Sequence, residues 1–397
     1  MFKPALFASV CALLAFAPTG RAVVALPPAG QYTALISPAG GATVAANNSG
    51  FISVKTTATG SATGFLFWKK VRYSLSGAFT AGGLTVNIAG KSPARTLVLA
   101  LGIGSGNING TLTDGDTVGN ITANVGNEAS PGKLTGLIEI GALTRPAASD
   151  DSVPLGEGIR AGVGYFTGTV SADGSVRVTG RLPDNWPFSC SSQIDSSNNI
   201  AIYSKTPRPG GTGIIAGRIF HPTKGVTLST LRLDRVASNT PRYGAGFSTA
   251  VTAETNYYVK PTTGPVVSFG SGTTNCTLTL SNGNLPSAVA IAAKYNDNNT
   301  LTIPTGNTIN YTSTIDTNTG LFRGNFQHPT LGRRLVFGAI VQESSSQNQG
   351  AARNGTRGEV PIPITYFGRA GGQFRYSVNG VVASSQIGAV RLGGLPR

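Results

Sequence analysis

Acidic, histidine and cysteine residues are scarce in this sequence, and each shortage restricts its chemistry. The 397 residues include 16 Asp and Glu, two His and three Cys. A glycosidase needs two carboxylates flanking a cleft, and a zinc site needs several nitrogen, sulfur or carboxylate ligands at short spacing. No such spacing occurs here. We therefore expect no catalytic residue, no metal and no cofactor, and we regard the protein as more likely a non-enzyme than an enzyme.

Charge is also sparse, because Asp, Glu, Lys and Arg supply only 12% of the residues, whereas Gly contributes 54 residues. Each interior Gly costs a helix about 1 kcal/mol relative to Ala, so long helices are disfavoured. Instead, Val71, Tyr73 and Leu75 alternate with polar residues, as in antiparallel strands with one face buried. Turn pairs such as Asp114-Gly115 and Asp173-Gly174 separate such runs. The sequence predicts an all-β fold of antiparallel hairpin or meander units that form two related barrels or sandwiches.

Long hydrophobic runs are absent after the first residues. Lys3 precedes an apolar run over residues 5–17, and Gly20-Arg21-Ala22 provides small residues for cleavage. This pattern predicts a signal peptide over residues 1–22. Later apolar runs are far shorter than the ~20 residues of a membrane helix, so no transmembrane helix is expected. The predicted location is secreted or in the cell envelope: the periplasm, the outer surface or the extracellular space.

Two cysteines remain after the predicted signal, Cys190 and Cys276. In an oxidising compartment they could form a disulfide. Two separate buried thiols are an equally acceptable interpretation.

The most informative pattern is an internal repeat. Residues 217–225 read Gly-Arg-Ile-Phe-His-Pro-Thr-Lys-Gly, and residues 324–332 read Gly-Asn-Phe-Gln-His-Pro-Thr-Leu-Gly. Both histidines, His221 and His328, lie in this motif, where Pro and Gly favour a turn rather than a metal site. A polar stretch over residues 147–158 is the best candidate for a linker. The predicted organisation is a signal peptide (1–22), an N-terminal β unit (23–150), a second β unit with repeated hairpins (151–349) and an Arg-rich C-terminal segment with a final hairpin (350–397).

Positive charge gathers towards the C-terminus. From residue 321 to residue 397 there are nine Arg, no Lys and two Glu, so nine minus two gives +7. Arginine suits contacts with carboxylate or phosphate groups. The speculative ligand-binding residues are Arg323, Arg333, Arg334, Arg353 and Arg357, together with Trp186 as an aromatic in a loop. A solvated basic surface without a ligand is the alternative.

Gly and aromatic residues occur at similar spacing in six stretches, residues 30–33, 73–79, 164–170, 243–247, 320–326 and 337–342. In these stretches the chain resembles a group of Gly-rich exported β-repeat proteins from verrucomicrobial bacteria, whose function is uncharacterised. The resemblance implies export and a β architecture, and it implies no catalytic residue.

These observations favour an exported, non-catalytic β-scaffold of the cell surface or extracellular matrix. Its partner would be an acidic polysaccharide or another envelope component, without specific nucleic-acid binding. The alternative is a carbohydrate-active enzyme, a glycoside hydrolase or lyase, with acidic residues in a β cleft.

Overall fold

The computed structural model describes residues 26–89, 96–140, 163–183, 186–208, 211–222, 225–236, 247–269, 272–282, 285–306, 309–330, 332–344, 366–378 and 381–394. Within these ranges the chain forms antiparallel strands and one short 3-10 turn, Ala39–Gly41. The all-β prediction is confirmed. The predicted signal peptide (1–22) and the candidate linker (147–158) lie outside the described residues.

The strands form three sheets of eight strands each. The first contains β1 (Gly30–Pro38), β2 (Gly50–Thr56), β3 (Ser61–Trp68), β4 (Val71–Ala78), β5 (Leu84–Ala89), β6 (Thr96–Ile103), β7 (Asn107–Asp114) and β8 (Thr117–Asn124). The second contains β9 (Gly132–Ile140), β10 (Val163–Val170), β11 (Ser175–Arg181), β12 (Pro187–Gln193), β13 (Asn199–Arg208), β14 (Gly211–Phe220), β15 (Thr227–Arg235) and β16 (Phe247–Tyr258).

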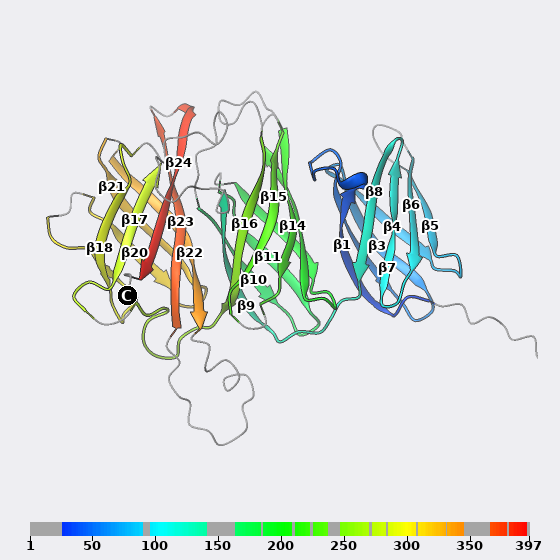
Figure 1. Cartoon of the computed structure of the whole chain (residues 1–397), viewed down its shortest axis with the longest axis horizontal. Coiled ribbons are helices and arrows are strands. Elements are labelled where there is room, and N and C mark those ends of the chain that lie inside the picture. Colours follow the sequence, from blue (N-terminus) through cyan, green and yellow to red (C-terminus); the bar gives the residue numbers. More distant parts are fainter. Residues whose placement is uncertain are drawn as a thin grey trace, which may run out of the picture.

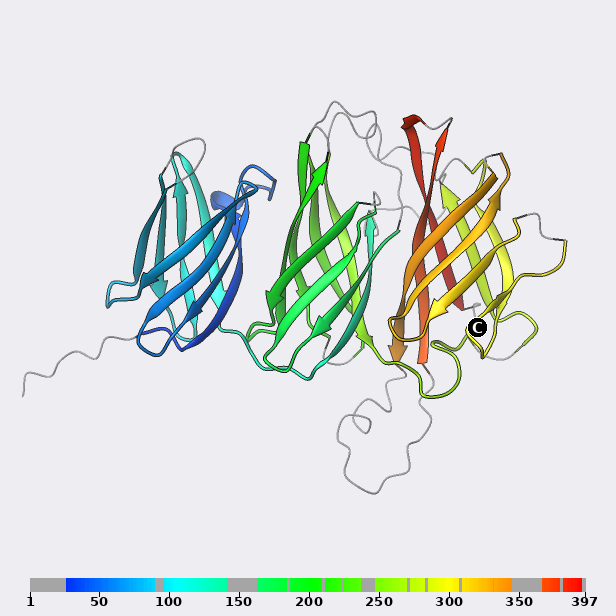
Figure 2. The ribbon, with the colours of Figure 1, turned by 180° about the vertical axis from the view of Figure 1, so that it is seen from behind.

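The third sheet contains β17 (Cys276–Asn282), β18 (Val289–Tyr295), β19 (Leu301–Thr302), β20 (Thr312–Asp316), β21 (Leu321–His328), β22 (Gly332–Ser344), β23 (Tyr366–Val378) and β24 (Val381–Gly394). In all three sheets the first strand pairs with the last in the interior of the sheet. The two edges are the fourth and fifth strands in the first two sheets, and the third and fourth strands, β19 and β20, in the third. Each sheet is rolled around its own core, and the three stand side by side in one row (Figures 1 and 2).

Strand alternation explains the cores. Tyr73 and Leu75 are buried in the first sheet, whereas Ser74 between them and Arg72 before them are exposed. The same alternation in β11 buries Val176 and Val178 in the second core. The third core contains Leu278, Phe326 and Ile340, among others. Period-two burial of this kind is what antiparallel strands with one wet face require.

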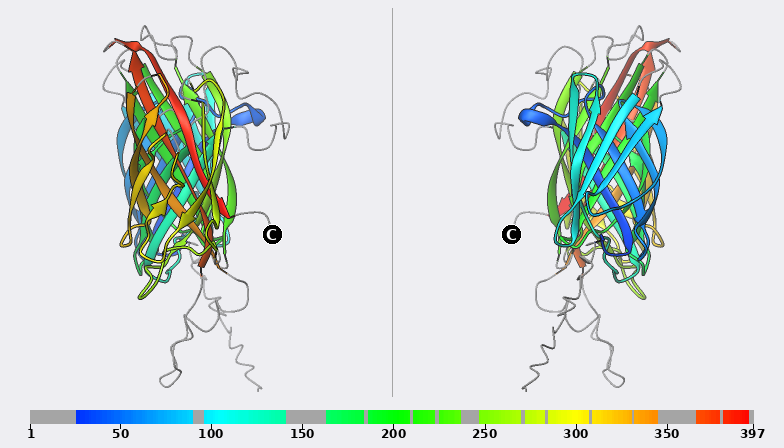
Figure 3. Two further views of the ribbon diagram at one scale, coloured as in Figure 1. Left: turned by 90° about the vertical axis from the view of Figure 1, so that its left-hand side faces the viewer. Right: turned by 90° about the vertical axis from the view of Figure 1, so that its right-hand side faces the viewer.

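Contacts between successive sheets hold the row together. Between the first and second sheets, Asp234 accepts a hydrogen bond from the Ala46 amide at 2.6 Å, and an apolar cluster includes Phe51 and Tyr203. Between the second and third, the Tyr258 hydroxyl donates to the Thr317 carbonyl at 2.7 Å. Viewed along the row, the three sheets overlap almost completely (Figure 3).

The organisation differs from the predicted one in the number of sheets and in their boundaries. There are three related sheets, one more than expected. The expected boundary near residue 150 falls between β9 and β10, which are paired neighbours in the second sheet. The expected C-terminal segment (350–397) contributes β23 and β24 to the third sheet, where β24 pairs with β17. The expected linker thus falls between two strands of the second sheet. The strand β24 completes the third sheet, whose first strand, β17, begins about a hundred residues earlier.

Candidate functional site: an aromatic cleft between the first two sheets

Aromatic side chains line the outer face of the first sheet where it meets the second. In the strand register Phe51 of β2 lies opposite Phe67 of β3, and Phe67 lies opposite Arg72 of β4. Because side chains alternate along a strand, Leu66 and Trp68 enter the core while Phe67 points outward. The Phe-Leu-Phe-Trp run is therefore apolar on both faces, and its outward face lies against a neighbouring sheet.

A tyrosine from the second sheet completes the cluster. The ring of Tyr203, in β13, stacks on Phe67 with centroids 6.1 Å apart and on Phe51 at 6.5 Å. Phe65 meets Phe67 edge to face at 5.6 Å. Each such pair contributes about 0.5–1.5 kcal/mol beyond burial, so the aromatic wall is rigid. Burial raises the pKa of Tyr203 to about 12, so its hydroxyl stays neutral at physiological pH.

Three cations surround this wall. The Arg72 guanidinium carbon lies 4.5 Å from the centroid of Phe65, and the Lys205 ammonium lies 5.6 Å from that of Phe67. Lys205 also donates a hydrogen bond to the Lys70 carbonyl at 2.6 Å. Arg177 of β11 is exposed on the opposite side of the cleft. Contacts with aromatic faces hold the Arg72 and Lys205 charges beside the cavity.

The enclosed space, here named the aromatic cleft, has a volume of about 630 Å³. This lies within the range of small-molecule sites. No Asp or Glu occurs among its lining residues, which are Phe51, Phe65, Phe67, Arg72, Arg177, Pro187, Phe188, Ser189, Cys190, Ser191, Tyr203, Ser204 and Lys205. The electrostatic environment therefore favours an anionic ligand that also presents an apolar face.

The cysteines are not joined. Cys190 lies in β12 of the second sheet and Cys276 begins β17 of the third, and both thiols are free. Of the two interpretations, separate thiols hold and the disulfide does not, because β12 and β17 belong to different sheets. Burial raises the pKa of Cys190 to about 12 and that of Cys276 to about 11. Although Cys190 lines the aromatic cleft, its thiol stays protonated and is a poor nucleophile.

The structure places the described members of the predicted arginine set on two different faces of the third sheet. Arg323 lies opposite Phe337 and Arg333 lies opposite Gln327, so both point away from the third core. Arg334 lies opposite the buried Phe326 and therefore shares the other face of the sheet. Arg353 and Arg357 fall outside the described residues.

Trp186, the predicted loop aromatic, is half-buried between β11 and β12, where its carbonyl accepts a hydrogen bond from the Leu182 amide at 2.8 Å. It precedes Pro187, which lines the aromatic cleft, but it is not itself a lining residue.

A second cleft, here named the Arg323 cleft, lies where the second sheet meets the third. Its volume is about 460 Å³, and its walls include Tyr165 of β10, Asp316 of β20, Arg323 of β21 and Phe337 of β22. Hydrogen bonds from Thr319 and Asn318 lower the pKa of Asp316, so this carboxylate is ionised. Burial raises the pKa of Tyr165, against the opposing effect of Arg181.

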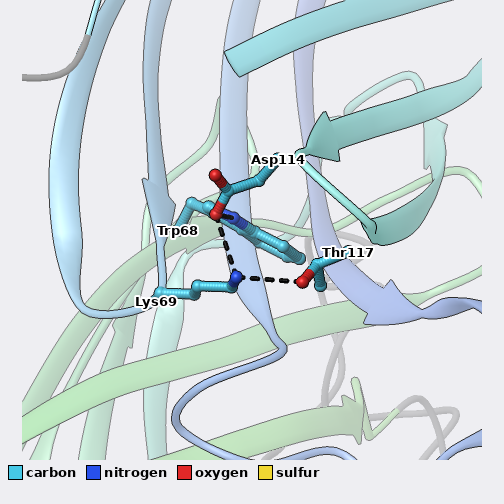
Figure 4. Close-up of polar contacts among 4 residues, drawn as sticks. All are labelled: Trp68, Lys69, Asp114 and Thr117. Atoms are coloured by element: carbon cyan, nitrogen blue, oxygen red, sulfur yellow. Dashed lines mark hydrogen bonds and ion pairs between the residues drawn. The ribbon is translucent and has the colours of Figure 1, made fainter. Parts of the chain in front are cut away.

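A buried carboxylate joins two turns at one end of the first sheet (Figure 4). Asp114 Oδ2 accepts a hydrogen bond from the Trp68 indole nitrogen at 2.9 Å and forms an ion pair with Lys69 Nζ at 2.9 Å. Lys69 also donates to the Thr117 hydroxyl at 3.1 Å. From the sequence, Asp114 was interpreted only as a turn residue. In the structure Asp114 also accepts the hydrogen bond of the Trp68 indole, and Trp68 is the largest buried side chain in this core.

The two histidines serve separate turns. His221 hydrogen-bonds the Tyr257 hydroxyl, and His328 Nδ1 accepts from the Thr330 amide at 3.2 Å. Across the described ranges, no group of three His, Cys, Asp or Glu residues is arranged to hold a metal ion. In the same part of the chain, no helix has the length and apolar character to cross a membrane.

Comparisons with known proteins add little. No family model matches this chain, and no curated protein matches it. Solved structures of CghA and of CghA with Sch210972 align over 93% of this chain and 89% of theirs, at 10% identity. Their TM-scores are 0.15 and 0.14, and a likeness at this level carries no argument.

Proposed function

We propose that this chain is an exported, non-catalytic scaffold protein that binds polyanionic glycans through the aromatic cleft. The observation that supports this proposal is the combination of three cations with an aromatic wall and no carboxylate among the lining residues. Sulfate and carboxylate groups of a glycan would contact Arg72, Arg177 and Lys205, while the apolar face of a sugar would lie on Phe65 and Phe67. Rigid aromatic and arginine side chains are the usual anchors of binding sites.

Binding is favoured over catalysis by the distribution of acids. Glycoside hydrolysis uses two carboxyl groups about 5–10 Å apart. The aromatic cleft presents none among its lining residues, and the Arg323 cleft presents one, Asp316, whose oxygens accept hydrogen bonds within its own turn. Export and a place at the cell surface or in the matrix are part of the proposal, and they rest on the N-terminal apolar run and on the resemblance to exported β-repeat proteins.

The test is the retention of the full chain on immobilised heparin, as a polyanionic glycan, over a salt gradient. We expect salt-sensitive retention, because the contacts are charged and partly exposed. The double variant Arg72→Gln/Lys205→Gln should elute at clearly lower salt. The control Lys260→Gln/Lys294→Gln removes two charges from exposed lysines outside the cleft and should elute close to the wild type. Equal losses for the two double variants would show that net charge alone, and not the cleft, causes retention.

A further inference from the structure

The two clefts are connected by one continuous surface, the outer face of β10, β11 and β12. In Figure 2 these strands are turned towards the viewer, together with β2–β4 on one side and β20–β22 on the other. The aromatic cleft includes Arg177 of β11, and the Arg323 cleft includes Tyr165 of β10. Because β10 and β11 are paired neighbours, the two clefts border the same half of the second sheet.

The strand register gives their separation. Arg177 lies opposite Thr169, and Tyr165 lies four residues before Thr169 on the same strand. One strand spacing across the sheet and four residues along it place the two Cα atoms about 14 Å apart. Pro187, at the edge of the aromatic cleft, lies two strands from Tyr165 in the same row, about 10 Å away. An oligosaccharide of several residues is long enough to contact Arg177 in one cleft and to continue past Tyr165 to Arg323 in the other.

The surface between the clefts suits a glycan chain. Side chains that point outward alternate along these strands, and between the clefts they include Thr167 and Thr179, which lie in one row with Ser189 at the edge of the aromatic cleft. Arg181 lies opposite Tyr165, with which it forms a hydrogen bond. None of the outward-pointing residues of β10–β12 is Asp or Glu. Hydroxyl and guanidinium groups are the partners that sugar hydroxyls and acidic substituents need.

We propose that one extended acidic glycan chain lies across β10–β12 and enters both clefts, with Arg323 and Phe337 forming the second contact. In the Arg323 cleft the acidic groups of the glycan would face Arg323, and its neutral hydroxyl groups would face the Asp316 carboxylate. This inference rests on the proposed function and extends it from a single site to a line of subsites. A chain that engages both clefts gains affinity because its second contact is intramolecular once the first has formed.

Single-stranded nucleic acid is the competing polyanion, and the structure favours a glycan. Nucleic-acid grooves use exposed aromatic faces on which successive bases stack. Here the surface between the clefts presents the hydroxyl groups of Thr167 and Thr179 instead of rings, so successive bases along that path would have no aromatic face on which to stack.

The experiment measures the binding of a heparin disaccharide, a heparin dodecasaccharide and a twelve-nucleotide single-stranded DNA to the full chain by calorimetry at low salt. We expect the dodecasaccharide to bind at least about tenfold more tightly than the disaccharide and more tightly than the DNA. Arg323→Gln should remove most of that length advantage while leaving disaccharide binding unchanged. Thr179→Glu, which adds a negative charge between the clefts, should act in the same way. Thr85→Glu, the same change at an exposed position of β5, should leave both affinities unchanged.

The outcomes separate the two proposals. If the dodecasaccharide keeps its advantage in both Arg323→Gln and Thr179→Glu, the two-cleft path is wrong, and binding of the disaccharide to the aromatic cleft still supports the proposed function. If neither saccharide binds, the proposed function fails together with the path. Tighter binding of the DNA than of the dodecasaccharide would overturn the assignment to a glycan.

Discussion

Replacement of Asp114 by alanine should destabilise the first sheet more than any other removal of a single carboxylate from that sheet. The Trp68 indole N–H is fully buried and hydrogen-bonds to this carboxylate. A buried donor left without an acceptor costs about 1–3 kcal/mol. The Lys69 side chain is 22% exposed, so loss of the ion pair adds only about 0–1 kcal/mol. The expected decrease in the free energy of unfolding is therefore about 1–4 kcal/mol.

The assay is urea denaturation of the full chain in a Trp186→Phe background, in which Trp68 is the remaining tryptophan and reports on the first sheet. Asp114→Asn keeps an oxygen acceptor for the indole and should cost about 1 kcal/mol. Asp116→Ala, an exposed acid in the same turn, is the matched control and should cost at most about 0.5 kcal/mol. Equal midpoints for Asp114→Ala and Asp116→Ala would refute the reasoning, because they would mean that the buried contact contributes nothing.

Three further results follow from the geometry. Gly174→Ala should lower the free energy of unfolding by at least about 1 kcal/mol in chemical denaturation. The reason is that Gly174 has φ 75° and that a Cβ there would lie 1.8 Å from the Asn127 carbonyl oxygen. An unchanged free energy of unfolding would contradict this steric argument. Stability should be constant between about pH 6 and pH 9 and fall as the pH rises towards 12, because folding raises the pKa of Cys190 from 9.0 to about 12 and that of Cys276 to about 11, so the unfolded chain loses these protons first. Denaturation midpoints that rise between about pH 9 and pH 12 would contradict the sign. Both thiols should react with a thiol reagent at pH 8 much faster in denaturant than in the native protein, whereas a disulfide would leave no reactive thiol in either state.

Much of the fold follows from local sequence signals. Alternation correctly predicted that Tyr73 and Leu75 enter the first core, whereas Val71, at the start of the same run, is exposed. Turn pairs such as Asp173-Gly174 marked hairpins that the structure contains. These signals are visible because strand periodicity and turn chemistry act over a few residues. They do not reveal which distant strands pair, and the pairing of β24 with β17 depends on such a contact.

The repeated His-Pro-Thr motif illustrates this limit. Each copy does lie between two paired strands, β14 and β15 in one case and β21 and β22 in the other. However, the first pair is the sixth and seventh strands of its sheet, and the second pair is the fifth and sixth. The motif thus specifies a turn, whereas the structural repeat is the eight-stranded sheet, which no short motif marks.

The candidate site was missed for a related reason. Residues 65–68 form a continuous apolar run, Phe-Leu-Phe-Trp, and such a run does not by itself show that Phe65 and Phe67 point away from the core. A strand with apolar residues on both faces must cover its second face with another part of the protein. That signal was present in the sequence, but the partner, Tyr203, lies more than a hundred residues away in another sheet. The C-terminal arginines were noticed because they are close in sequence, yet Arg333 and Arg334 lie on opposite faces of one strand.

The central claim is that the aromatic cleft holds an anionic glycan, and a crystal structure of the full chain soaked with a heparin tetrasaccharide tests it most directly. The account predicts a sugar ring against Phe65 and Phe67, with its acidic groups within hydrogen-bond distance of Arg72 and Lys205. A saccharide bound only elsewhere, such as on the outer face of β22 beside Arg333, with the cleft empty, would contradict it.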